Sequence, residues 1–127
     1  MSNLSHLPRI PLTHLPTPIE PMPGLSKHLD GPTILVKRDD LTSLAMGGNK
    51  TRKLEFLLAD AIEQKADTVI TSGGPQSNHC RLTAAAATRL GLKCELVFGG
   101  EPSDERPNGN LFLDQLFGAA VHWSKPD

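Results

Sequence analysis

The sequence is organised around Gly47-Gly48-Asn49-Lys50-Thr51-Arg52-Lys53, a stretch that places two lysines at the start of an amphipathic helix. After this stretch, apolar residues recur with the spacing of one helical face, at Leu54, Leu57, Leu58, Ala61 and Ile62. Asn49 is a favourable N-cap, because its side-chain oxygen can accept from the free N–H groups of the first turn. We therefore expect a helix over residues 49–64.

The two lysines are unusual at this end of a helix, because the macrodipole already makes a helix N-terminus positive. Burial or positive surroundings destabilise an ammonium group, and a lysine that is neutral near pH 7 is a nucleophile that forms Schiff bases with carbonyl compounds. A solvent-exposed Lys/Arg run accounts for the stretch equally well. The stretch alone therefore leaves two interpretations, a reactive Lys50 or a charged helix end.

Strands and helices alternate on either side of this helix. β-Branched residues predict a strand over 67–72, and turn residues follow it over 73–79. The remaining pattern predicts a strand over 33–37, a helix over 77–90, a strand over 92–98, a loop over 99–108, a helix over 109–117 and a strand over 120–123. This β-α-β-α-β-α-β order predicts an α/β fold with one parallel sheet and flanking helices.

The turn Gly73-Gly74-Pro75-Gln76-Ser77-Asn78-His79 lies where α/β folds bind ligands, at the carboxyl end of a parallel strand. Because it opens a helix, its backbone N–H groups can bind an anion, while Ser77 and Asn78 can orient a carboxylate or a ring oxygen. A serine N-cap followed by polar loop residues is the simpler interpretation. His79 could act as a general base, but a lone histidine in a first helical turn is more often structural. The turn lacks the glycine spacing of dinucleotide sites and the Walker lysine, which disfavours a nucleotide-binding domain.

Other polar residues have structural interpretations. Asp39 and Asp40 are adjacent and would point in opposite directions in an extended segment, so they make a poor catalytic pair. We expect them to anchor a loop or to pair with Arg38 or Arg52. Residues 108–110, Asn-Gly-Asn, are typical of a turn and a helix cap.

Composition limits the partners and the compartment. The net charge of −1, with acids and bases interspersed, indicates neither a nucleic acid nor an anionic membrane as partner. Cys80 and Cys94 lack the spacing of a metal site, so we expect no metal and two free, buried thiols in a reducing compartment. Prolines interrupt the N-terminal segment where a signal peptide needs an apolar run, and no stretch is long enough to span a bilayer. We therefore expect a cytoplasmic protein.

Four motifs follow one another along the chain. They are Pro16-Thr17-Pro18, Lys37-Arg38-Asp39-Asp40, Gly47-Gly48-Asn49-Lys50-Thr51-Arg52-Lys53-Leu54-Glu55-Phe56 and Gln76-Ser77-Asn78-His79. Together they resemble the pyridoxal-phosphate enzymes of the family that contains D-cysteine desulfhydrase and 1-aminocyclopropane-1-carboxylate (ACC) deaminase. The resemblance runs from Pro16 to about Trp123 and implies a tryptophan-synthase-β-like fold, whose members are much longer than this chain. It implies that residues 1–46 are an arm and strand of the large domain, and that residues 47–127 are an incomplete small α/β domain.

The resemblance also implies a role for each residue of the two central motifs. Lys50 matches the lysine that carries pyridoxal phosphate covalently and moves protons at the substrate carbon. Lys53 matches a residue near the cofactor phosphate, and Asn78 matches the amide that hydrogen-bonds the 3-hydroxyl of the pyridine ring. Ser77 matches a hydroxyl that assists proton transfer near the substrate. Gln76, with the groups from Ser77 to His79, would bind the substrate carboxylate.

The activity implied by the resemblance is β-elimination from a small amino acid by a homodimeric lyase or deaminase. For D-cysteine, this reaction gives pyruvate, ammonia and sulfide. The sequence Ser77-Asn78-His79 is closer to the desulfhydrase branch, because ACC deaminases tend to have glutamine after the asparagine. ACC deaminase is one alternative. A catalytically silent α/β module is another, because the family's tyrosines, catalytic acid and phosphate-binding glycines belong to its C-terminal half.

Overall fold

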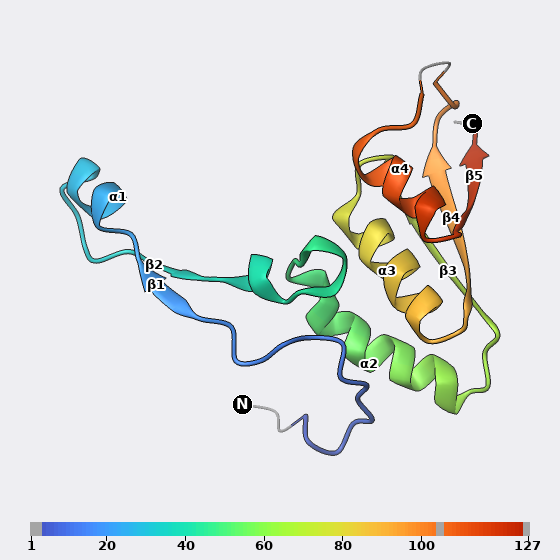
Figure 1. The fold of residues 1–127 in the computed structure, drawn as a ribbon, viewed down its shortest axis with the longest axis horizontal. Coiled ribbons are helices and arrows are strands. Elements are labelled where there is room, and N and C mark those ends of the chain that lie inside the picture. The colour runs from blue at the N-terminus through green and yellow to red at the C-terminus, as the bar shows by residue number, and fades with distance from the viewer. Residues whose placement is uncertain (1–3, 104–105, 126–127) are drawn as a thin grey trace.

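The helices and strands follow the sequence pattern closely. The structure, a computed structural model, describes residues 4–103 and 106–125. Its helices are α1 (Pro23–His28), α2 (Lys50–Glu63), α3 (Asn78–Arg89) and α4 (Gly109–Leu116), with short 3₁₀ segments at Asp39–Leu41 and Leu44–Met46. Its strands are β1 (Ile19–Pro21), β2 (Leu35–Lys37), β3 (Thr68–Gly73), β4 (Lys93–Gly99) and β5 (Ala120–Ser124) (Figure 1). Residues 1–3 and 126–127, at the ends of the predicted domains, and residues 104–105 of the predicted loop lie outside the described residues.

A three-stranded parallel sheet, in the order β3-β4-β5, carries the second half of the chain. Because successive strands are neighbours, right-handed crossovers place α3 and α4 on the same face of the sheet (Figure 1). Leu96 and Phe98 are fully buried on that face. On the opposite face Ile70 is 71% exposed, and His122 contacts Glu95. The described helices therefore cover one side of the sheet only.

The predicted elements occur in the predicted order, but the strand before the lysine helix does not join this sheet, so the parallel sheet holds three of the four predicted strands. β2 pairs antiparallel with β1, with Glu20 opposite Val36. The partner strand β1 was not predicted, because it ends at a proline and follows two others. β2 is only three residues long, and pairing with a nearby segment costs less loop-closure entropy than reaching a sheet formed by later strands. The two-stranded ribbon and α1 extend away from the parallel sheet in Figure 1.

Helix α3 is buried on nearly every side. Its residues 80–87 are all buried, and four of them are alanines. Such small side chains let α2, α4 and the sheet approach the helix axis closely. Cys80 and Ala84 pack with Leu96 and Phe98 between α3 and the sheet, whereas Leu82 packs with Leu54 of α2. Both cysteines are free and buried, as predicted.

Buried Glu55 of α2 holds the N-terminal arm. Its Oε1 accepts from Leu12 N at 2.8 Å, from Thr13 N at 2.9 Å and from Thr13 Oγ1 at 2.5 Å. Its Oε2 accepts from Arg9 Nε at 2.7 Å. The arm therefore lies along α2 because one carboxylate accepts hydrogen bonds from three of its residues, Arg9, Leu12 and Thr13.

The adjacent acids of the loop pair with arginines, which confirms their predicted structural role. Asp39 accepts from Arg52 Nε at 2.8 Å, and Asp40 accepts from Arg38 Nη2 at 2.6 Å. The hydrogen bonds from Arg52 hold the pKa of Asp39 below its usual range. This pairing fixes the loop to the first turns of α2. Among the described residues, no helix is long and apolar enough to cross a membrane, and no cluster of residues has the make-up of a metal site.

Candidate active site

The loop before the two lysines follows a backbone path that requires glycine. Gly47 has a φ of +72°, and a Cβ at this position would lie 1.8 Å from Asp40 O. Gly48 N donates to Thr42 Oγ1 at 2.9 Å, and Thr42 is fully buried. The loop is thus fixed from both sides before α2 begins.

Asn49 does not cap α2 with its side chain, which corrects that prediction. Its φ of −64° and ψ of −18° are already helical, whereas a capping side chain needs an extended backbone at its own residue. Gly48 O instead accepts from Thr51 N at 3.3 Å and from Thr51 Oγ1 at 3.2 Å. The helical turn therefore starts one residue early, and Lys50 lies in the first turn as expected.

Lys50 and Lys53 lie near the start of α3. Lys50 is half-buried and Lys53 is exposed. Burial lowers the pKa of His79, and the positive charges of Lys53 and Lys50 lower it further. Both ammonium groups are therefore within electrostatic range of the first turn of α3. The lysine helix and the polar turn, which are separate in the sequence, are neighbours in the structure.

The turn before α3 caps the helix as the sequence predicts. Ser77 has an extended backbone, and its Oγ accepts from Cys80 N at 3.3 Å. His79 Nε2 contacts Thr71 Oγ1 at 3.1 Å, while His79 Nδ1 is buried without a hydrogen-bond partner among the described residues. Buried nitrogens without a partner are rare in native proteins, so His79 Nδ1 has capacity for one further hydrogen bond.

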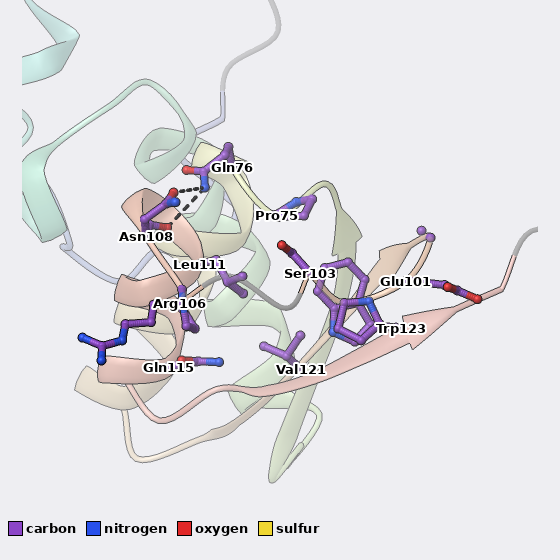
Figure 2. Close-up of a pocket in the computed structure, with 14 residues that line it drawn as sticks. Pro75, Gln76, Glu101, Ser103, Arg106, Asn108, Leu111, Gln115, Val121 and Trp123 are labelled. Carbon is purple, nitrogen blue, oxygen red and sulfur yellow. Dashed lines mark hydrogen bonds between the residues drawn. The ribbon is translucent and has the colours of Figure 1, made fainter.

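The side chain of Gln76 reaches the start of α4. Its Oε1 accepts from Asn110 N at 2.9 Å, and its Nε2 donates to Asn108 O and to Asn108 Oδ1, both at 3.2 Å (Figure 2). A cavity of about 500 Å³ lies beside Gln76, between α4 and the ends of β4 and β5, with Trp123 in its wall (Figure 2). Neither lysine of α2 lines this cavity, so we place the candidate chemistry at the start of α2 and α3 instead.

Arg81 joins three loops beneath this turn. It is 8% exposed, and its Nη2 donates to Gly47 O at 2.8 Å. Its Nη1 donates to Asn110 Oδ1 at 2.9 Å and lies 3.3 Å from Asn78 Oδ1. One buried guanidinium group thus connects the glycine loop before Lys50, the first turn of α3 and the first turn of α4.

Comparison with known proteins identifies the family. A family model described as a pyridoxal-phosphate dependent enzyme matches residues 10–127. The chain belongs to this family of pyridoxal-phosphate-dependent enzymes. The match includes both the lysine helix and the polar turn, so the family assignment covers the whole candidate site.

Two curated relatives and one solved structure refine the comparison within the pyridoxal-phosphate family. The chain is 52% identical over 125 residues to a D-cysteine desulfhydrase of Klebsiella pneumoniae, covering 95% of this chain and 38% of that protein. It is 49% identical to a D-cysteine desulfhydrase of Salmonella paratyphi B, also over 38% of that protein. A crystal structure of an ACC deaminase homologue matches 98% of this chain and 37% of its own, with a TM-score of 0.88 and 42% identity. The chain therefore spans well under half the length of these relatives.

The groups at the site fit the cofactor of the family. Pyridoxal phosphate carries an aldehyde, a phosphate and a phenolic oxygen, which require an amine, positive or N–H groups and a hydrogen-bond donor. Lys50 offers the amine, and Lys53 offers a second cation. The first turn of α3 offers backbone N–H groups, which are free to bind an anion at a helix start. Asn78 offers an amide.

Three residues of the site were not predicted from the sequence, namely Thr42, Arg81 and Asn110. Arg81 had a visible signal, because it is the one charged residue in the alanine-rich run 80–87. A charge inside a helix that is otherwise apolar on all sides must find buried partners. Thr42 had no comparable signal, and residues 108–110 predicted a turn and a helix cap but no contact with Arg81.

Proposed function

We propose that this chain supplies the lysine side of a pyridoxal-phosphate site in a lyase that acts on a small amino acid, with D-cysteine as substrate. The observation that carries the proposal is the hydrogen bond from Arg81 Nη2 to Gly47 O at 2.8 Å, which joins the glycine loop before Lys50 to the first turn of α3. The similarity to D-cysteine desulfhydrases and the Ser-Asn-His sequence at 77–79 support this substrate. Pyruvate, ammonia and sulfide would be the products.

The roles of the residues follow from their chemistry. When bound, pyridoxal phosphate withdraws electrons from the α-carbon of an attached amino acid, which permits loss of a proton and of a β-leaving group. Lys50 would hold the cofactor through its amine and exchange the proton at the α-carbon once that amine is released. Lys53 would neutralise charge on the phosphate. Asn78 would donate to the phenolic oxygen.

The turn before α3 would bind the substrate. Ser77 N donates to Gly74 O at 2.9 Å, so the backbone N–H groups of Asn78 and His79, together with the dipole of α3, favour a carboxylate at this position. The Gln76 side chain is engaged at α4, so we assign its contribution to the backbone of the turn. Ser77 Oγ accepts from Cys80 N and retains a proton that it can donate to the substrate.

We also propose a wider setting for the chain. Residues 1–46 would belong to the large domain of such an enzyme and residues 47–127 to its small domain. This division is supported by the ribbon of β1 and β2, which stands apart from the parallel sheet. A homodimer in the cytoplasm, acting in amino acid metabolism, would be the working form.

The lysine assignment is tested by trapping the cofactor. The chain is mixed with pyridoxal phosphate, reduced with borohydride to make the bond to the lysine amine permanent, digested, and mapped by mass spectrometry. We expect the label on Lys50 in the wild type and in Lys53→Ala, with weaker cofactor binding in the latter. Loss of the label is expected in Lys50→Ala. If Lys50→Ala takes up as much covalent label as the wild type, the assignment is refuted.

The reaction is tested with two substrates. D-Cysteine should yield sulfide and pyruvate, whereas ACC would yield ammonia and a four-carbon 2-oxo acid without sulfide. ACC deaminase is the second candidate because the matching crystal structure is of an ACC deaminase homologue. Turnover of ACC alone would favour it. Cofactor labelling without turnover of either substrate would favour a silent module.

A further inference from the structure

The hydrogen bonds around Arg81 determine which way two asparagine side chains face. A guanidinium group only donates hydrogen bonds. The group that Arg81 Nη1 contacts at 2.9 Å on Asn110 must therefore be the oxygen of the amide. Asn110 Nδ2 then lies on the other side, where it donates to the carbonyl oxygen of Gln76 at 2.8 Å. A carbonyl only accepts, so both neighbours of Asn110 require the same orientation.

The orientation of Asn110 fixes that of Asn78. Asn110 Nδ2 also donates to Asn78 Oδ1 at 2.9 Å, and Arg81 Nη1 lies 3.3 Å from the same oxygen. A reversed Asn78 amide would place its NH₂ group against two donors. Asn78 Nδ2 therefore has no hydrogen-bond acceptor among the described residues, and its two N–H groups are free to donate.

The same guanidinium group connects this amide to the lysine helix. Arg81 Nη2 donates to Gly47 O at 2.8 Å, and Gly47 precedes Lys50 by three residues. The glycine loop has no freedom to move away, because Gly47 lies against Asp40 and Gly48 is bound by Thr42. Arg81 thus holds Asn78 and the start of α2 in one rigid arrangement.

We propose that Arg81 and Asn110 are positioning residues that present Asn78 Nδ2 as an obligate hydrogen-bond donor to the phenolic oxygen of pyridoxal phosphate. This inference rests on the proposed function, since it assigns a determinant of the same cofactor site. A donor at that oxygen stabilises its deprotonated, negatively charged form. Arg81 and Asn110 would thereby set the proton affinity of the bound cofactor without touching it.

The substitution Asn110→Asp tests the proposal with little change of shape. An aspartate only accepts, so it cannot donate to Asn78 Oδ1, and we expect the Asn78 amide to reverse and to donate inward. The variant loses the bond from Asn110 Nδ2 to Gln76 O, but it should fold, because an acid in the first turn of α4 suits the helix dipole and Arg81 lies beside it. The matched control is Asn108→Asp, which adds the same charge two residues away where the side chain already accepts from Gln76.

Two measurements decide the outcome. Without cofactor, NMR of the side-chain amides should show solvent-exposed Asn78 NH₂ protons in the wild type and in Asn108→Asp, and protected ones in Asn110→Asp. With pyridoxal phosphate, the pH midpoint of the visible absorption band should rise by about one pH unit in Asn110→Asp and much less in Asn108→Asp. Asn78→Asp, which removes the donor and adds a charge beside the phenolic oxygen, should raise the midpoint at least as much as Asn110→Asp.

The contradicting results are distinct from a failure of the proposed function. Protected Asn78 NH₂ protons in the cofactor-free wild type would overturn the inference. Equal midpoints in the wild type and Asn110→Asp would also overturn it, while leaving the cofactor site intact. If no variant binds pyridoxal phosphate, the proposed function fails and the role toward the phenolic oxygen falls with it.

Discussion

Two buried carboxylates of this chain have opposite surroundings. Glu55 of α2 is 1% exposed and Asp114 of α4 is fully buried. Glu55 accepts hydrogen bonds from the arm on both of its oxygens. Neither oxygen of Asp114 has a hydrogen-bond partner among the described residues. The two carboxylates are equally buried, so they differ only in the hydrogen bonds that they accept.

The donors reverse the effect of burial on the pKa. At Glu55 burial favours the neutral acid, but the hydrogen bonds from Thr13, Leu12 and Arg9 together outweigh it and hold the pKa below its usual value. At Asp114 burial raises the pKa to about 6, and the charge of Arg81 opposes it only in part. A buried acid therefore fastens the arm in one region and weakens the packing in the other.

The largest expected effect is that of Glu55→Gln. The substitution keeps the shape but removes the charge, and it turns an NH₂ group toward donors of the arm. Breaking a buried, hydrogen-bonded charge of this kind costs about 4 kcal/mol. We expect the arm to leave α2, and trypsin cleavage after Arg9 at pH 7 to accelerate, because proteolysis measures the population of the open form.

The control for this substitution is Glu63→Gln, at the exposed end of the same helix. Its effect should stay within about 0.5 kcal/mol. Equal cleavage rates in Glu55→Gln and in the wild type would mean that the arm is held by its apolar contacts instead.

The next effect is a pH dependence caused by Asp114. Between the ordinary pKa of 3.8 and the folded value of about 6, the folded state keeps a proton that the unfolded state releases. Stability should therefore fall as pH rises through this window, by at most about 3 kcal/mol. Asp114→Asn should remove that slope. Urea unfolding at intervals from pH 4 to pH 7 measures it.

Glu55 should contribute with the opposite sign. Its folded pKa lies below the ordinary value of 4.5, so its stabilisation is present above pH 4.5 and is lost as pH falls through the folded pKa. Above about pH 6, where folded Asp114 is charged, Asp114→Asn also removes the charge beside Arg81 and shifts stability. The slope and not the absolute value is therefore the diagnostic quantity, and an unchanged slope in Asp114→Asn would show that Asp114 is not the titrating group.

The regular elements were predictable because their signals are local. Apolar spacing and β-branched runs predicted α2, α3 and the parallel strands to within one or two residues, and Ser77 caps α3 as expected. The partner of β2 was not predictable, because a three-residue strand carries no information about its neighbour. The cap at Asn49 failed because the glycine loop continues the helical turn backwards.

The residue pattern marked the candidate site as two separate stretches, and the family resemblance assigned them to one cofactor. Lys50 is marked by its odd position at a helix start, and the turn before α3 by its composition. Their contact depends on Arg81, whose partners Gly47 and Asn110 lie 34 and 29 residues away. Such long-range pairs follow from packing and leave no periodic signal in a single sequence.

The smallest expected effect is that of Glu55→Gln on the labelling of the two buried cysteines. It tests whether the arm and the core between α3 and the sheet unfold separately. Leu12 and Leu54 pack in a cluster between the arm, α2 and α3, whereas Cys80 and Cys94 pack between α3 and the sheet. Burial raises the pKa of both thiols, to about 11 for Cys94, so their labelling by a maleimide requires opening of the core. We expect Glu55→Gln to release the arm and leave labelling at the wild-type rate. If the arm and the core instead open as one unit, the loss of about 4 kcal/mol would speed labelling by about a thousandfold.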